Sequence, residues 1–189
     1  MNTVQNKFLI DELQSHTAMF NKLDSLFPYI IVVADVLRTT IRHGGKILLM
    51  GNGGSAADSQ HIAAEIVGRY KKERRGLPAI ALTTDTSIIT CVGNDYSFEY
   101  IFARQIEALC RPEDSVFGIS TSGNSKNVSN AIIEANLIGA TTIGLTGGTG
   151  GELLNLCKFN LVIPSNETPR IQEAHIFIGH CLCALLEAD

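Results

Sequence analysis

The hydrophobic pattern of the chain changes near residue 45. Before that point, apolar residues recur at helix-like spacing, so we expect a first helix that Pro28 breaks and a second helix over 29–42. Beyond it, short continuous apolar runs alternate with amphipathic stretches. The apolar runs predict strands over 46–50, 79–83, 115–120, 141–146 and 159–164, and the amphipathic stretches predict helices over 55–70, 87–93, 98–110, 125–138, 151–156 and 169–187.

This alternation predicts the fold class. Strands that are apolar throughout are typical of a sheet buried on both faces, and strands that alternate with helices indicate parallel pairing. The sequence therefore predicts an α/β fold with a five-stranded parallel sheet. We expect one domain over 1–189, in which residues 1–45 form a helical extension that packs on the domain and on an oligomer interface.

Composition and charge narrow the function classes. The 189 residues carry a formal net charge of −4, which argues against a nucleic-acid partner. The five cysteines include no C-x-x-C pair, so reduced thiols are expected rather than disulfides or a zinc finger. No apolar run approaches the ~20 residues of a membrane span, and the polar start does not resemble a signal peptide. These features predict a cytoplasmic protein with no membrane contact.

Three turns after the predicted strands are rich in glycine and hydroxyl side chains: "GNGGS" (51–55), "STSGNS" (120–125) and "TGGTG" (146–150). Ligands of an open parallel sheet bind beyond the carboxyl ends of its strands. The hydroxyl set of the second turn is Ser120, Thr121, Ser122 and Ser125. Together with the start of the following helix it predicts a phosphate site, although turn and capping roles would use the same residue types. The third turn fits a plain turn equally well.

The first turn also matches a dinucleotide fingerprint. Gly51, Gly53 and Ala56 fit the pattern G-x-G-x-x-G/A. That fingerprint requires an acidic residue about 20 residues further on. The nearest candidate, Asp85, comes too late in the chain, so dinucleotide binding is the weaker interpretation.

Polar residues at helical spacing follow the first turn. His61, Glu65 and Arg69 are four residues apart, so a helix over 55–70 places them on one face. They could form a solvated stripe, bind a metal such as Zn²⁺, or provide Glu65 as a general base. The last predicted helix offers similar groups, which are Gln172, Glu173, His175 and His180.

Gln172 and His180 are eight residues apart, or ~12 Å along a helix axis. If both serve one site, we expect an adjoining subunit to supply one of them. Both side chains of one chain on one ligand would contradict this expectation.

The motifs "GNGGSAADSQHIAAE", "GND" (93–95), "STSGNS" and "RIQEAH" with the later "GH" resemble those of phosphoheptose isomerases in the sugar-isomerase (SIS) domain family. The resemblance covers nearly the whole chain. It implies a flavodoxin-like three-layer α-β-α sandwich and a homotetramer with active sites at subunit interfaces. It also implies isomerisation of D-sedoheptulose 7-phosphate to D-glycero-D-manno-heptose 7-phosphate through an enediol. In bacteria that reaction is the first step toward the ADP- or GDP-heptose of lipopolysaccharide cores and capsules.

The resemblance also implies residue roles. Glu65 would be the catalytic base and His180 its partner acid or base. His61, Glu65, Gln172 and His180 would hold one Zn²⁺ per subunit. The implied substrate contacts are Asn52, Gly53, Gly54, Ser55, Glu65, Arg69, Asn94, Asp95, Ser120, Thr121, Ser122, Ser125 and Gln172. Pro169 departs from the pattern, because some family members carry an acidic residue there.

Two other functions stay open within the same family. A non-enzymatic branch binds the bacterial replication initiator. That branch lacks the carboxylate and the imidazole of the catalytic pair and has arginine at the position of Ser122, whereas this chain keeps Glu65, Ser122 and His180. A sugar-phosphate sensor, or an isomerase of another specificity, is the remaining alternative.

Overall fold

The structure, a computed structural model, describes residues 3–188. Its first elements are the helix α1 (Thr3–Phe20), a 3-10 turn (Leu23–Leu26) and the helix α2 (Phe27–Arg42). The prediction that Pro28 breaks a helix was wrong, because Pro28 lies in the first turn of α2. The backbone N–H groups of a first turn have no intrahelical partner, so a proline costs little there. As predicted, the chain leaves α2 before Gly44, whose φ of 82° favours glycine.

The rest of the chain forms the predicted parallel sheet. Its strands are β1 (Ile47–Gly51), β2 (Ala79–Ala81), β3 (Ser115–Ser120), β4 (Thr141–Gly147) and β5 (Phe159–Ile163), in the order β2-β1-β3-β4-β5. Every strand pair is parallel. The intervening helices are α3 (Gly54–Val67), α4 (Thr86–Asp95), α5 (Ala103–Leu109), α6 (Lys126–Ile138), α7 (Leu153–Leu156) and α8 (Thr168–Leu186). This strand order is that of flavodoxin-like folds, as expected.

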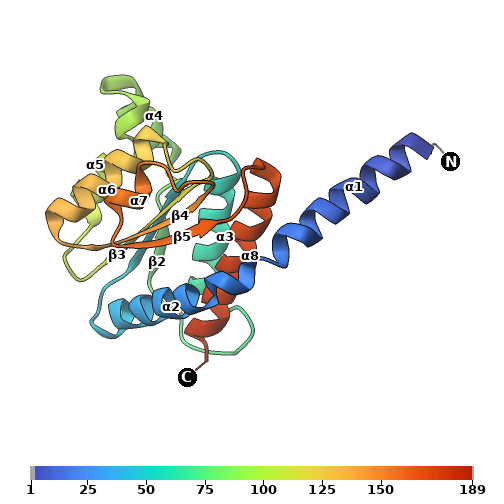
Figure 1. The fold of residues 1–189 in the computed structure, drawn as a ribbon. Helices are drawn as coiled ribbons and strands as arrows, with labels where there is room; N and C mark the ends of the chain where they lie inside the picture. The colour runs from blue at the N-terminus through green and yellow to red at the C-terminus, as the bar shows by residue number, and fades with distance from the viewer. Residues whose placement is uncertain (1–2, 189) are drawn as a thin grey trace.

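Apolar residues on both faces of the sheet explain why its strands are continuous in hydrophobicity. In β1, Ile47 and Leu49 pack toward α2, α3 and α8, whereas Leu48 and Met50 pack toward α4, α5, α6 and α7. Successive side chains of a strand point to opposite faces, so both kinds of position must be apolar. The result is the three-layer arrangement visible in Figure 1.

Helix α1 extends away from this body (Figure 1). Its contact with α8 includes an edge-to-face pair of Phe20 and Phe177. A polar network accompanies it, in which the Arg170 guanidinium donates to the Glu12 backbone oxygen and to the Glu173 carboxylate. His16 pairs with the other oxygen of Glu173 at 2.8 Å. The exposed apolar side chains of α1 are Val4, Phe8, Leu9, Ile10 and Leu13. None of the helices within residues 3–188 has an apolar stretch of the length that a membrane span requires.

Candidate active site

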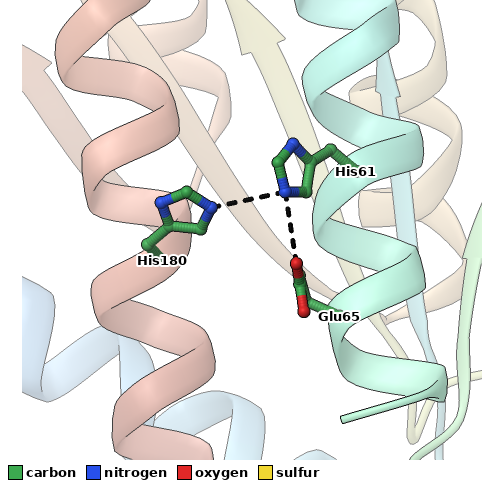
Figure 2. Close-up of side chains that lie close together, drawn as sticks. All are labelled: His61, Glu65 and His180. Carbon is green, nitrogen blue, oxygen red and sulfur yellow. Dashed lines mark hydrogen bonds and ion pairs between the residues drawn. The ribbon is translucent and has the colours of Figure 1, made fainter. Parts of the chain in front are cut away.

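Two helices on the same face of the sheet bring the predicted catalytic residues together. His61 and Glu65 lie one turn apart on α3, and His180 lies on the adjacent α8 (Figure 2). The Nε2 atom of His61 is 3.3 Å from Glu65 Oε1 and 3.3 Å from His180 Nε2. The helices can approach closely because Gly179 packs against Ile62, where a Cβ on residue 179 would lie 2.6 Å from Ile62 Cδ1. We call His61, Glu65 and His180 the carboxylate–imidazole cluster.

The cluster has the composition and spacing of a metal site. One ligand atom of each of its three residues lies within 4.8 Å of the other two. Two ligands of a tetrahedral Zn²⁺ are about 3.3 Å apart when each bond is about 2.0–2.1 Å. The two distances from His61 Nε2 therefore match the spacing of zinc ligands, and the third pair, Glu65 and His180, lies within 4.8 Å. An imidazole pair with one carboxylate is also a donor set that zinc prefers.

The turn after β1 has the backbone that its glycines predict. Gly53 has φ 54°, in the left-handed region, and precedes the first residue of α3. Gly54 lies against α8, where a Cβ on residue 54 would be 2.7 Å from Gln172 Nε2. Gln172 therefore lies at the start of α3, whereas His61 lies seven residues further along that helix. Ser55 is buried within the same first turn.

The hydroxyl-rich turn after β3 borders a hollow. Ser120 Oγ and Ser125 Oγ are 2.9 Å apart, and Ser122 Oγ accepts a hydrogen bond from the Asn124 backbone. The hollow has a volume of ≈ 230 Å³ and is lined by Thr121, Ser122, Gly147, Gly148, Thr149, Asn166, Thr168 and Ile171. The "TGGTG" turn thus faces the hydroxyl turn across this hollow.

Gly123 brings these two turns together. Its φ is 67°, and a Cβ at this position would lie 2.0 Å from the Gly150 backbone oxygen. Only glycine fits there without displacing the second turn.

Other predicted contacts lie apart from the cluster. Asn94 and Asp95 are exposed at the end of α4, where their side chains hydrogen-bond to each other. The prediction that Arg69 continues the polar face of α3 was wrong, because α3 ends at Val67 and the Gly68 backbone turns the chain away. Arg69 is exposed and pairs with Glu73 at 3.4 Å.

The remaining polar groups of α8 serve the fold. Glu173 belongs to the network with α1. His175 is fully buried, and its Nε2 lies 3.2 Å from the Thr146 backbone oxygen. Burial lowers the pKa of His175 to about 4, against the opposing effect of this hydrogen bond. His175 is therefore neutral at physiological pH. Pro169 lies in the first turn of α8, where it suits the helix start.

The structure also shows a contact that we did not predict. Asn52, after β1, and Asn127, in the first turn of α6, exchange two amide hydrogen bonds of 2.8 Å. The pair spans the point between β1 and β3 at which the strand order reverses, which is where ligands of such sheets bind. The Asn127 side chain is buried, and no spacing pattern in the sequence marks it.

Comparison with known proteins agrees with this geometry. The family model described as the SIS domain matches residues 14–147. The chain is 56% identical to the phosphoheptose isomerase of Trichlorobacter lovleyi over 181 aligned residues. The alignment covers 95% of this chain and 92% of that protein. It is 60% identical over 158 residues to the phosphoheptose isomerase of Aquifex aeolicus, covering 84% of this chain and 83% of that protein.

A solved structure extends the agreement to three dimensions. The phosphoheptose isomerase GmhA from Neisseria gonorrhoeae superposes with a TM-score of 0.93 at 38% identity, covering 99% of this chain and 100% of the other. The match includes α8, which lies beyond the residues of the family model. The chain therefore belongs to the SIS-domain family and, within it, to the phosphoheptose isomerases.

Proposed function

We propose that this chain interconverts D-sedoheptulose 7-phosphate and D-glycero-D-manno-heptose 7-phosphate, with Glu65 and His180 as its proton-transfer groups. The observation that carries the proposal is the convergence of the carboxylate–imidazole cluster from α3 and α8. Membership of the phosphoheptose isomerases supports the substrate. The product would supply a nucleotide-activated heptose for a lipopolysaccharide core or capsule.

The reaction needs a carboxylate and a second acid–base group. The Glu65 carboxylate would take a proton from C1 of the ketose while the C2 oxygen gains a proton, which gives the enediol. The C1 oxygen then loses a proton and C2 receives one, which gives the aldose. His180 would carry the protons of the oxygens, because its imidazole lies across from Glu65 in the cluster.

The hollow beside the hydroxyl turn would anchor the phosphate. Hydroxyl donors and glycine backbone line it, and α6 begins directly after the turn. Binding energy from this remote group orients the sugar for proton transfer. The Asn52–Asn127 pair would hold the neighbouring turn in place.

Zn²⁺ is the metal that the cluster favours. The spacing of the donor atoms of His61, Glu65 and His180 supports it, and the amide oxygen of Gln172, supplied by an adjoining subunit, could add a fourth ligand. Bound there, Zn²⁺ would stabilise negative charge on the substrate oxygens. The same imidazole and carboxylate groups hold and move protons when the ion is absent.

The distances along α8 support sites shared between subunits of a homotetramer. Ile171 lines the hollow, and His180 lies nine residues further along the helix, which is about 14 Å. From C1 to the phosphorus the extended substrate reaches at most about 12 Å, because six C–C bonds of about 1.5 Å give about 9 Å and the C–O–P linkage adds about 3 Å. This separation favours a site in which the phosphate anchor and the cluster for one substrate come from different subunits. The exposed apolar residues of α1 offer a surface for that assembly.

Turnover of sedoheptulose 7-phosphate by the purified protein tests the proposal. We expect Glu65→Gln and His180→Asn to lose at least about 100-fold in kcat, the lower end of general acid–base effects. Exposed residues of the same types serve as controls: Glu107→Gln and His43→Asn should keep wild-type rates.

Parallel assays with a chelator and with added Zn²⁺ measure the contribution of the metal. Folded wild-type protein that turns over nothing, even with Zn²⁺, would overturn the proposal. Direct binding to the replication initiator would then favour the non-enzymatic branch.

A further inference from the structure

The C-terminal end of α8 holds a buried carboxylate that the reaction does not use. Glu187 accepts backbone hydrogen bonds from Tyr70, Lys71 and Lys72 at 2.7, 2.8 and 3.0 Å. The Nε atom of Arg74 lies 3.1 Å from the same carboxylate, whose side chain is 2% exposed. Both carboxylate oxygens therefore have partners, and the charge has a cation beside it. A buried carboxylate with this many partners fixes the backbone that surrounds it.

Arg74 ties the same segment to the cluster-bearing helix. Its guanidinium donates to the backbone oxygen of Glu65 at 2.9 Å and to that of Gly68 at 3.2 Å. The segment 68–76 has no helix or strand of its own. Its conformation therefore depends on these bonds, which link the end of α3 to the end of α8. We call Glu187 and Arg74 the carboxylate–guanidinium clamp.

The clamp places an aromatic ring on His180. The rings of Tyr70 and His180 are stacked, with centroids 5.3 Å apart and planes 18° from parallel. His61 contacts the same imidazole edge-on, with centroids 5.1 Å apart and planes 70° apart. The Tyr70 side chain is half-buried against the apolar core on this face. His180 is thus held by one ring on its face and another at its edge.

This contact limits the rotation of a partly exposed imidazole. The His180 side chain could otherwise turn its Nε2 away from Glu65, because it has only one hydrogen-bond partner among the described residues, which is His61. A ring stacked on its face favours imidazole orientations that keep the two planes near parallel. The observed orientation is the one that directs Nε2 into the cluster (Figure 2).

We propose that Tyr70 is a positioning residue that sets the plane of the His180 imidazole, and that the clamp of Glu187 and Arg74 holds Tyr70 in place. The catalytic consequence of this contact rests on the proposed function, whereas the contact itself does not. This positioning of His180 requires the aromatic ring of Tyr70 and does not require its hydroxyl group.

Nuclear magnetic resonance tests the contact without turnover. In protein labelled with ¹³C at histidine Cε1, the signal of His180 is assigned as the one that His180→Asn removes. We expect Tyr70→Leu to move this signal downfield by removing the ring current, and Tyr70→Phe to leave it near the wild-type position. A His180 signal that does not move in Tyr70→Leu would overturn the proposal.

Kinetics test the positioning role. We expect Tyr70→Leu to lower kcat roughly tenfold and to change KM by less than about twofold, because misorientation affects the transition state more than ground-state binding. Tyr70→Phe should restore most of the lost kcat. An equal loss of kcat in Tyr70→Phe and in Tyr70→Leu would overturn the proposed role of the ring. Wild-type protein without turnover would refute the proposed function and leave the resonance test to decide the contact.

Glu187→Gln tests the clamp while the Tyr70 ring is retained. The neutral amide loses the charge-assisted bonds, so we expect the His180 signal to shift and kcat to fall several-fold. Glu107→Gln, which removes the carboxylate of an exposed ion pair on α5, is the matched control and should change neither. Thermal melting verifies that each variant is folded. A folded Glu187→Gln protein with a wild-type His180 signal would refute the clamp, and this variant also decides the question if Tyr70→Leu does not fold.

Discussion

Acidification from pH 7 to pH 5 should destabilise the protein through His175. This residue is fully buried on α8, and its Nε2 donates to the Thr146 backbone oxygen when the ring is neutral. Its Nδ1 has no hydrogen-bond partner among the described residues. A proton added at Nδ1 would leave a buried charge without compensation, which is why burial lowers the pKa of His175 to about 4.

The size of the effect follows from the two pKa values. In the unfolded chain, histidine binds a proton below its ordinary pKa of 6.5, whereas folded His175 stays neutral until about pH 4. The unfolded state therefore binds more protons throughout this window, and stability falls as the pH falls. Over the 1.5 units from 6.5 to 5, at 1.36 kcal/mol per unit, the loss is about 2 kcal/mol. Glu187, whose pKa is lowered to about 2, titrates in a more acidic window.

Urea denaturation of wild type and His175→Gln at several pH values, at one protomer concentration, measures this loss. The glutamine amide can still donate to Thr146 but does not titrate. Because the other histidines are present in both proteins, their effects cancel in the comparison. We expect the wild type to lose about 2 kcal/mol more than the variant between pH 7 and pH 5. Parallel stability profiles for the two proteins would refute the reasoning.

Three further variants test the turns and the assembly. Asn127→Ala leaves the Asn52 amide without its partner, and we expect a loss of about 1–3 kcal/mol in the free energy of unfolding and a raised KM. Gly123→Ala places a Cβ at positive φ against the facing turn, so it should destabilise by more than about 1 kcal/mol and weaken binding of sugar phosphate in calorimetry; wild-type affinity would contradict the anchor. Leu9→Lys combined with Leu13→Lys should dissociate the proposed homotetramer in analytical ultracentrifugation without changing the circular dichroism spectrum, and an unchanged sedimentation coefficient would contradict the role of α1.

Local patterns predicted the sheet well, because each strand is buried on both faces and is therefore apolar throughout. The same patterns misplaced the ends of helices at positions where contacts with distant segments determine the end. The apolar spacing continued past Phe20, so the sequence did not reveal where α1 ends. The polar spacing continued to Arg69, but α3 ends at Val67, and the following segment is held by Glu187 from the far end of the chain.

In the candidate active site, too, local spacing predicted some features and missed those that depend on distant contacts. The pairing of His61 with Glu65 follows from helical spacing, and the approach of His180 was expected from the family resemblance. Contacts between distant segments were not predicted. The Asn52–Asn127 pair and the stack of Tyr70 on His180 each join residues that no local periodicity relates. Such contacts depend on how the helices lie over the sheet, which residue spacing along the chain does not specify.

Helix α8 carries Gln172 near one end and His180 near the other, so in a shared-site assembly each copy of this helix contributes to two active sites. Two inactive proteins could then complement each other. Subunits with Gln172→Ala and subunits with His180→Asn, mixed and reassembled, would form some sites that take both groups from intact partners. Random mixing in equal amounts gives about a quarter of such sites, since each site draws on two subunits. Activity recovered from two inactive parents would thus report the sharing of one helix between sites.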